Sequence, residues 1–338
     1  MFTLTKKQSE AVSQVCKMAS SRHANQGFEC VLIQADSETN TVKLTAGDSI
    51  VEIIRVLNTE VETSVSVAVN AAKFMQSVLA CGDCTVVVKD QMTIKNGRRS
   101  FKLHTVNSDA YPAYPDSVTE HEVNISPVSL IEAVKAVSFA SAKNDVRHIL
   151  NGVFIGRDAV ATNGHRVCLY PLGLEKSAIV SIEAVGKIPL DIDGKVYLSE
   201  NVLSIVSTEY SFKCKLIDGR YVPYEKILPK KFKHDVTVNT ADFIDAVKAA
   251  KINAPESGNI LLMFGEKSEI KSRSGKNEDA TVGFDCVSSA EFEIGFNSSY
   301  LIDALNVVVS ESVNIKFTES QVYIEDAGII SLISMVRI

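Results

Sequence analysis

Residues 122–140 form a segment that recurs along the chain, and this recurrence limits the folds that the sequence can adopt. Val123 and Ile125 alternate with polar residues, as in a half-buried strand. Ser126 is a typical helix N-cap, and Pro127 stands at the first helical position, where its missing N–H costs no hydrogen bond. The residues that follow place an apolar stripe on one helix face: Leu130, Ile131, Val134 and Val137.

The same pattern aligns without gaps to three other segments, residues 67–81, 235–250 and 293–308. The polar cap is an asparagine in each of them: Asn70, Asn239 and Asn297. Over one stretch the match is close, because IEAVKA in residues 131–136 becomes IDAVKA in residues 244–249. A strand, a polar cap and an amphipathic helix therefore recur along this chain.

Each recurring segment leads into further predicted strands. Residues 2–57 are typical of one strand, one helix and three strands, and residues 65–106 repeat that order. Two such half-units make a domain of about 115 residues. Two stretches that contain tyrosine and proline, residues 107–121 and 221–234, lack periodicity and are predicted to be linkers. The predicted domains are residues 1–118, 119–233 and 234–338.

The fourth half-unit departs from this pattern. Its strand is expected at residues 178–181, but the helix after Ser181 meets Gly186 and then Pro189, which stands where Val134 stands in the third copy. We therefore expect this helix to be truncated.

The repeats predict an α+β fold in which antiparallel sheets cover paired helices. One amphipathic helix cannot shield a four-stranded sheet, whereas two βαβββ half-units can pair their helices on one side and their sheets on the other. Three tandem domains of this kind make an arc, and two arcs can close head to tail into a ring with sheets outside and helices lining the hole. Lysines on the helices would then face the hole, although ordinary solvated helix charges explain them as well.

Composition narrows the class of protein. With 338 residues, of which 46% are apolar and 22% charged, the chain can bury several cores. A net charge of −6 argues against a surface that binds phosphates all over. Seven scattered cysteines favour a reducing cytoplasm, and no stretch has the apolar length of a membrane span.

The sequence contains no strong signal for catalysis or for a cofactor. Cys81 and Cys84 form a lone C-x-x-C at the end of a predicted helix, whereas a structural zinc site needs four ligands and a redox motif opens a helix. P-loop, G-x-G-x-x-G, H-E-x-x-H and G-x-S-x-G motifs do not occur. We expect no metal, no cofactor and no enzymatic activity, since an enzyme of antiparallel α+β fold would need a pocket with convergent titratable groups.

Four motifs occur in order in the last two thirds of the chain. Residues 145–169 read DVRHILNGVFIGRDAVATNGHRVCL, with R-x-x-LNG followed by VATNGHR. Residues 215–230, 293–306 and 335–338 read KLIDGRYVPYEKILPK, EIGFNSSYLIDALN and MVRI. Together these motifs resemble the bacterial DNA polymerase III beta subunit family, the sliding clamps, and the first domain matches it more weakly.

The resemblance implies three tandem clamp-type domains and a homodimeric ring that encircles duplex DNA and tethers DNA polymerase for processive synthesis. Topological linkage replaces affinity in such a ring, so an acidic protein with few phosphate contacts can slide on DNA. The alternative is a clamp-like docking platform, of phage, mobile-element or specialised origin, with altered partners. The short fourth helix, the altered tail and Lys251, at a position that is apolar in similar clamps, favour that alternative.

The resemblance also implies a groove in which polymerases and the clamp loader insert a short linear peptide. The tail SMVRI departs from the usual Met-Pro-Met-Arg-Leu, and Val222 replaces a usual proline, so the peptide preference is expected to differ. Within the groove, Asn163 and Gly164 predict a type I′ hairpin turn, with positive φ at both residues. The implied groove residues are Arg147, Leu150, Thr162, Gly164, His165, Arg166, Val167, Val222, Lys226, Ile227, Leu332, Ile333, Met335, Val336 and Arg337.

Two further sets of residues follow from the resemblance. The expected DNA-binding residues are Arg22, Lys73, Lys143, Asn144 and His148, although similar clamps often carry aromatic residues near His148. For the dimer interface, an edge strand of the first domain is expected to meet the third domain, with opposite charges favouring head-to-tail closure. The residues expected there are Arg98, Arg99, Phe101, Leu103, Ile252, Glu278 and Asp279.

Overall fold

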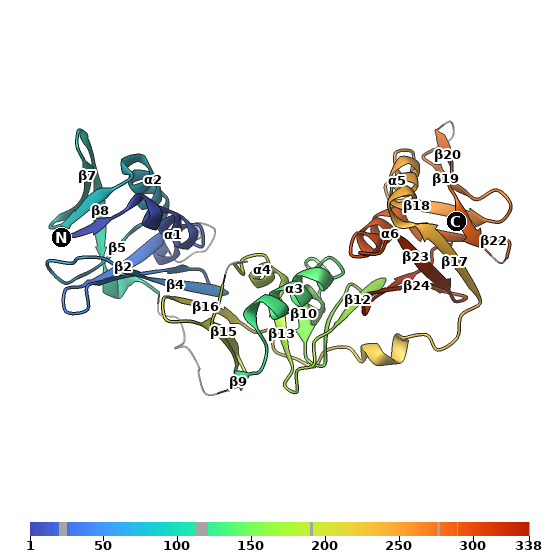
Figure 1. The fold of residues 1–338 in the computed structure, drawn as a ribbon, viewed down its shortest axis with the longest axis horizontal. Helices are drawn as coiled ribbons and strands as arrows, with labels where there is room; N and C mark the ends of the chain where they lie inside the picture. The colour runs from blue at the N-terminus through green and yellow to red at the C-terminus, as the bar shows by residue number, and fades with distance from the viewer. Residues whose placement is uncertain (20–25, 113–120, 190–191, 276–277, 289, 338) are drawn as a thin grey trace. The chain divides into compact units, whose positions relative to one another are not determined.

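The computed structural model describes residues 1–19, 26–112, 121–189, 192–275, 278–288 and 290–337 (Figure 1). The chain folds as two compact units. Unit 1 comprises residues 1–129 and 183–216, and unit 2 comprises residues 130–182 and 217–338. The predicted middle domain therefore contributes a part to each unit, and the predicted domain boundaries stay a prediction.

Unit 1 contains two complete half-units in the predicted order of strand, helix and three strands. The first consists of β1 (Phe2–Leu4), α1 (Lys6–Cys16), β2 (Cys30–Asp36), β3 (Thr41–Gly47) and β4 (Val51–Asn58), with the 3₁₀ helix η1 (Gln26–Glu29) before β2. The second consists of β5 (Val65–Asn70), α2 (Ala71–Cys81), β6 (Cys84–Val88), β7 (Gln91–Asn96) and β8 (Arg99–Asn107), followed by η2 (Ser108–Ala110). The unit also contains β9 (Glu122–Val123), β14 (Lys195–Leu198), β15 (Val202–Val206) and β16 (Tyr210–Lys215).

Unit 2 contains the remaining elements, with α3 (Pro127–Ser138) and α4 (Ile182–Val185) at its boundary. Its earlier part consists of η3 (His148–Asn151), β10 (Gly152–Ile155), β11 (Asp158–Thr162), β12 (Arg166–Pro171), β13 (Ala178–Ser181) and η4 (Tyr224–Ile227). The fifth half-unit consists of β17 (His234–Asn239), α5 (Thr240–Lys251), β18 (Asn259–Phe264), β19 (Glu269–Arg273) and β20 (Asp279–Gly283). The short strand β21 (Cys286–Ser288) precedes the sixth, which consists of β22 (Phe292–Asn297), α6 (Ser298–Leu305), β23 (Ser312–Phe317), β24 (Gln321–Asp326) and β25 (Ile329–Ser334).

The polar residue before each long helix caps it, as the repeat predicts. The side chains of Asn70, Asn239 and Asn297 each accept a hydrogen bond of 3.1 Å from the backbone N–H three residues later. Ser126 does the same at 3.0 Å. In contrast, α4 extends over four residues, which confirms the predicted truncation.

The strands of unit 1 form one antiparallel sheet. Among the described residues it has twelve strands in the order β1-β6-β7-β8-β5-β2-β3-β4-β16-β15-β14-β9. Strand β4 pairs with β16 over five residue pairs, so the sheet passes from the first predicted domain into the second. In this seam Glu52 lies opposite Lys213, and Nζ and Oε2 are 3.0 Å apart in a pair that is almost wholly buried. The α+β prediction is confirmed.

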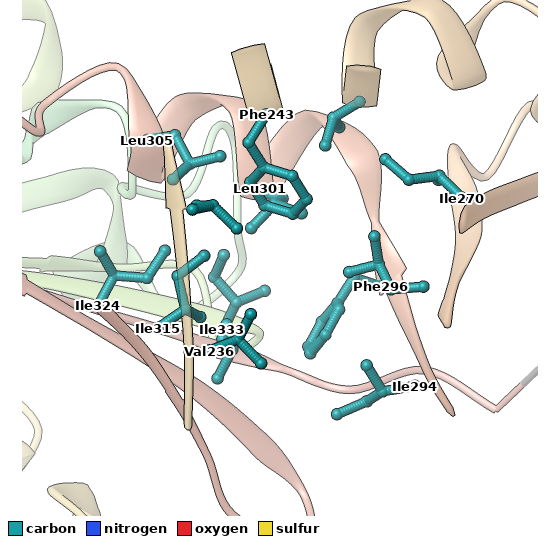
Figure 2. Close-up of a cluster of buried hydrophobic side chains, with 14 of the residues drawn as sticks. Val236, Phe243, Ile270, Ile294, Phe296, Leu301, Leu305, Ile315, Ile324 and Ile333 are labelled. Atoms are coloured by element: carbon teal, nitrogen blue, oxygen red, sulfur yellow. The ribbon is translucent and has the colours of Figure 1, made fainter. Parts of the chain in front are cut away.

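The core of unit 2 lies between two antiparallel sheets and the helices α5 and α6. The sheets are β13-β10-β11-β12-β25-β24-β23-β17-β21 and β20-β19-β18-β22. Figure 2 shows the side chains that fill the space between them, among them Phe243, Phe296 and Leu301. Phe243 and Leu301 belong to the apolar helix stripe that the repeat predicts, because both align with Leu130.

Candidate functional site

A small cavity of about 120 Å³ opens on the face of the nine-stranded sheet of unit 2 that carries Val167 and Leu332. It lies where the β11–β12 hairpin, the 3₁₀ helix η4 and the last strand, β25, come together. It is smaller than the roughly 300–1,000 Å³ of small-molecule sites, so it fits one or two side chains of a partner. The residues around it are Thr162, Gly164, His165, Arg166, Val167, Ile227, Gln321, Leu332 and Ser334.

Long-range strand pairing creates the floor of this cavity. Strand β25 pairs with β12, so that Leu332 stands opposite Val167, although 164 residues separate them in the sequence. Both side chains are 2% exposed. They belong to one apolar cluster, which also contains Val160, Leu169, Ile179, Tyr221 and Tyr224.

The segment that carries Ile227 is held in place by two tyrosines. Tyr221 stacks on Phe154 with ring centroids 5.2 Å apart, and the Tyr224 hydroxyl donates a 2.8 Å hydrogen bond to the Asp158 carboxylate. Residues 221–234, predicted to be a linker, include the 3₁₀ helix η4, which these contacts hold against the sheet. The sequence does not reveal this helix, because the buried tyrosines follow no helical or strand period.

The turn between β11 and β12 is organised by side chains. The Asn163 carboxamide oxygen accepts hydrogen bonds from the N–H groups of His165 and Arg166, at 2.9 and 3.1 Å. Gly164 has a φ of 88°, but Asn163 is not among the residues with positive φ. The type I′ prediction was therefore wrong, because the Asn163 side chain satisfies the N–H groups of a longer connection. Gly164 is nevertheless required for the positive φ.

The predicted groove residues occupy different positions around the cavity. Seven of them border it: Thr162, Gly164, His165, Arg166, Val167, Ile227 and Leu332. Val222 packs against the apolar cluster below, and Leu150 is buried. Lys226 and Arg337 are exposed, while Met335 and Val336 are half-buried and their N–H groups donate to Ser320 and Gly295 carbonyls at 2.9 Å.

Two of the predicted groove side chains point away from the cavity. Arg166 and Ile333 are paired across β12 and β25, and their side chains lie on the opposite face from Val167 and Leu332. Ile333 lies in the core with Ile315 and Ile324 (Figure 2). This orientation follows because neighbouring strand residues alternate between faces. The assignment of Arg166 and Ile333 to the groove stays a prediction.

Arg166 uses its guanidinium to fasten the hairpin to the core. Nη1 lies 2.6 Å from the Asp303 carboxylate, and Nη2 donates to the Phe139 carbonyl. The guanidinium carbon is 4.3 Å from the centre of the Tyr300 ring. These contacts position the turn that carries His165, so Arg166 supports the cavity wall rather than offering a charge to a partner.

Arg147 lies at the rim of the cavity. Its guanidinium is close to Gly164, where a Cβ would stand 3.3 Å from Nη2. It makes a 2.9 Å ion pair with Asp145, and the hydrogen bonds from Arg147 lower the pKa of that carboxyl to about 2. The pair is exposed to solvent, so it orients the guanidinium and adds little stability.

Gln321 and Ser334 border the cavity but were missed by sequence reasoning. They stand opposite each other in the β24–β25 pair. Ser334 lies next to the tail residues that were predicted to line the groove. The hairpin around Gly328 then places Gln321 opposite Ser334. The period of two along the hairpin could have identified both residues.

The predicted DNA-binding residues that the structure describes lie in both units. Lys73 is exposed on the first turn of α2, in unit 1. In unit 2, Lys143, Asn144 and His148 are exposed in one loop; Asn144 has a φ of 59°, and the His148 ring nitrogen Nε2 is 3.1 Å from the Asp218 carbonyl. Arg22 lies outside the described residues.

The predicted interface residues lie at two sheet edges. Strand β8 pairs with β7 through residues 99–104 and with β5 through residues 105–107. Residues 99–104 therefore have one side without a strand neighbour in the described part of unit 1. Arg99, Phe101 and Leu103 lie on that stretch, whereas Arg98 lies in the preceding turn, not on the strand as predicted. In unit 2, Asp279 begins the outer strand β20, Glu278 precedes it, and Ile252 is 81% exposed at the end of α5.

The C-x-x-C pair spans the end of a helix and the start of a strand. Cys81 ends α2 and Cys84 begins β6, and burial raises the pKa of the Cys84 thiol to about 11. No group of three or more His, Cys, Asp or Glu side chains in the described ranges could hold a metal ion. Across the same ranges, no helix combines the length and the apolar character of a membrane span.

Known proteins of one family match all three parts of the chain. Residues 1–115, 124–223 and 225–329 match the models of the N-terminal, central and C-terminal domains of the DNA polymerase III beta subunit. The beta sliding clamp of Escherichia coli strain K12 is 30% identical over 259 residues, 71% of each chain.

Solved structures show the same fold. A DNA polymerase sliding clamp from Pseudomonas aeruginosa, solved with a ligand, has a TM-score of 0.91 at 22% identity, covering 100% of this chain and 99% of that one. The clamp from Bacillus subtilis has a TM-score of 0.90 at 23% identity, with the same coverage.

Proposed function

This chain belongs to the DNA polymerase III beta subunit family, and from that premise we propose that it encircles duplex DNA as a head-to-tail homodimer and tethers a DNA polymerase to its template. The membership confirms the family resemblance of the sequence motifs. It also favours a sliding clamp over the alternative of a divergent docking platform. The proposal assigns no reaction and no cofactor to the chain, and it places the protein in the cytoplasm with the DNA.

One observation carries the partner-binding part of this proposal: the apolar cavity at the meeting point of β12, β25 and η4. Its floor is formed by Val167 and Leu332, and its rim by Ile227, whose side chain is 44% exposed. An exposed aliphatic side chain beside a cavity of this size with an apolar floor is suited to one or two apolar side chains of a short peptide. DNA polymerase and the clamp loader are the proposed sources of that peptide.

Loader-dependent DNA synthesis tests this role. Ile227→Asp puts a charge at the rim without disturbing the buried floor, and Val287→Asp is its matched control because Val287 is 76% exposed on β21, at the far edge of the same sheet. We expect Ile227→Asp to reduce product length to the value without clamp and the control to preserve it. Equal product lengths for the two variants would refute the assignment of the cavity.

The C-terminal tail offers a second test of the same site. Met335 and Val336 are attached by main-chain hydrogen bonds to Ser320 and Gly295, after the last strand has ended. Deleting residues 335–338 should therefore abolish partner binding and leave the circular dichroism spectrum and the dimer unchanged. Unchanged affinity for the polymerase after the deletion would contradict the proposal.

For DNA, we propose that Arg22, Lys73, Lys143, Asn144 and His148 face the duplex. Lys73 and the loop from Lys143 to His148 expose cationic and polar groups without a deep pocket, as suits weak, sequence-independent contact with phosphates. Replacing Lys73 and Lys143 with Gln should weaken binding to all DNA sequences equally. It should also reduce the dependence of binding on salt concentration, by a slope of about 0.9 per lost contact. A sequence-dependent loss would exclude this role.

For the dimer, we propose that the free side of β8 pairs with β20 of a second copy. Both are outer edges in the described parts of their units, and an unpaired edge is a template for strand addition. Opposite charges at the two edges favour head-to-tail closure. One edge carries Arg98 and Arg99, and the other carries Glu278 and Asp279. Sedimentation at submicromolar concentration tests this: a dimer that dissociates on Arg98→Glu is expected, and a wild-type monomer would refute it.

A further inference from the structure

An aromatic and basic surface continues from the cavity along the same face of the sheet. A row of five residues crosses neighbouring strands of the sheet, in the spatial order β11, β12, β25, β24 and β23. Each residue stands opposite the next: Thr162, Val167, Leu332, Tyr323 and Lys316. Residues directly opposite in an antiparallel sheet share a face and contact their neighbours. The cavity floor therefore leads directly onto the Tyr323 and Lys316 side chains.

Phe232 covers the far end of this row. Its ring centre lies 5.0 Å from that of Tyr323, and Lys316 Nζ lies 5.3 Å from the Phe232 ring centre and 5.8 Å from that of Tyr323. Phe232 is 37% exposed although it is a large apolar side chain. We call Phe232, Lys316 and Tyr323 the aromatic patch.

The charges around the aromatic patch favour an anionic occupant. Lys230, Lys231 and Lys233 are exposed on the segment that carries Phe232. The nearby carboxylates have partners within the protein. Glu325 accepts a 2.7 Å hydrogen bond from the Tyr323 hydroxyl, and Glu319 lies 3.9 Å from Lys233 Nζ. Asp235, which stands opposite Lys316 in the β17–β23 pair, accepts a 3.4 Å hydrogen bond from the Asn314 side-chain amide. The Lys316 ammonium lies over the two rings, and its contact with them positions it to bind a carboxylate.

We propose that the aromatic patch is a second contact for the peptide whose apolar residue fills the cavity, and that it selects peptides with a carboxylate three residues from that apolar residue. The spacing follows from sheet geometry, because Leu332 and Lys316 are two strands apart, about 10 Å, and an extended peptide rises about 3.3 Å per residue. Continuity with the cavity identifies the occupant as the same peptide. This inference rests on the proposed function.

Fluorescence anisotropy with four labelled pentapeptides tests the inference. Asp-Ser-Gly-Leu-Phe and the reversed Phe-Leu-Gly-Ser-Asp place a carboxylate three residues from leucine for either chain direction, and two counterparts carry Asn in place of Asp. The phenylalanine can cover the exposed Ile227. We expect one Asp peptide to bind about two- to five-fold more tightly than its Asn counterpart, the range for a partly exposed ion pair.

Variants of the full chain assign that preference to the aromatic patch. Lys316→Gln should abolish the preference for Asp and leave the affinity for the Asn peptide unchanged, Lys316→Arg should restore it, and Phe232→Ser should weaken both peptides. Lys271→Gln is the matched control, because Lys271 is a half-exposed lysine on the other sheet of unit 2, 3.7 Å from a glutamate. It should change neither affinity.

The possible results distinguish a failure of the aromatic patch assignment from a failure of the cavity assignment. Equal binding of the Asp and Asn peptides in both orientations, or a preference that survives Lys316→Gln, overturns the aromatic patch and leaves the cavity intact. Binding of none of the peptides overturns the cavity assignment and this inference together. If oligo(dT) binds instead and is released by Phe232→Ser, the surface is a nucleic-acid site and the peptide assignment is wrong.

Discussion

The buried ion pair between β4 and β16 gives a sharp test of how the sheet of unit 1 holds together. Glu52 and Lys213 lie opposite each other, with side chains 8% and 6% exposed and Nζ 3.0 Å from Oε2. Glu52→Leu removes the carboxylate and leaves the ammonium buried without its counter-charge. The expected loss of free energy of unfolding at this seam is about 3–5 kcal/mol, the usual cost of breaking a buried pair.

Hydrogen exchange measures this loss where it occurs. Since about 1.4 kcal/mol corresponds to a factor of ten, amides in β4 and β16 should exchange about 100- to 4,000-fold faster in the variant, up to the limit set by global unfolding. The double variant Glu52→Leu with Lys213→Met should restore protection to within about tenfold, because an apolar pair of similar volume replaces the ionic one.

The matched control for this prediction is an exposed ion pair in the same sheet. Lys195 Nζ lies 2.8 Å from the Glu122 carboxylate, with side chains 61% and 50% exposed. Lys195→Gln should leave the exchange of the nearby amides almost unchanged, because water screens an exposed ion pair. If Glu52→Leu accelerates exchange no more than this control does, the reasoning that burial decides the strength of the pair is refuted.

Three further predictions concern single residues. Arg166→Met should lower the free energy of unfolding of unit 2 by about 2–4 kcal/mol, through the lost contacts to Asp303, Phe139 and Tyr300; an unchanged urea midpoint would contradict the supporting role. The folded-state pKa of Asp145 lies at about 2, below its unfolded value of about 3.9, so its stabilising effect is present above pH 4 and is lost as the pH falls through 2; carbon NMR should follow this titration, and Arg147→Gln should raise the pKa. Cys84 should react with iodoacetamide at pH 8 at least ~100-fold more slowly than a free thiol, because its pKa is about 11, and fast labelling in the native protein would disprove its burial.

Local features of the fold could be predicted from the sequence because they depend on neighbouring residues. Ser126 and Asn239 cap the helices that follow them, and the apolar stripes of those helices have the fixed period of a helix. All four stripe residues of the third copy are buried. The shortened fourth helix follows from Gly186 and Pro189, which act within one turn.

The candidate site could be predicted only in part, because it depends on pairing between distant strands. The resemblance placed Val167 and Leu332 in one groove, but the register of β12 against β25 decides that Arg166 and Ile333 face the core instead. The type I′ prediction for the turn at Asn163 was wrong for a different reason, because a side-chain hydrogen bond replaced the expected backbone geometry. Phe232 gave no sequence signal, because its contact with Tyr323 joins a loop to a strand some 90 residues away.

The most direct test of the sliding clamp function is whether the protein is held on DNA by topology. The chain is loaded by its clamp loader onto a nicked circular plasmid, the free protein is removed by gel filtration, and half of the complex is cut with a restriction enzyme at a single site. The account predicts that the protein stays with the circle and leaves the linear DNA at its ends. Equal retention on circular and linear DNA would contradict it.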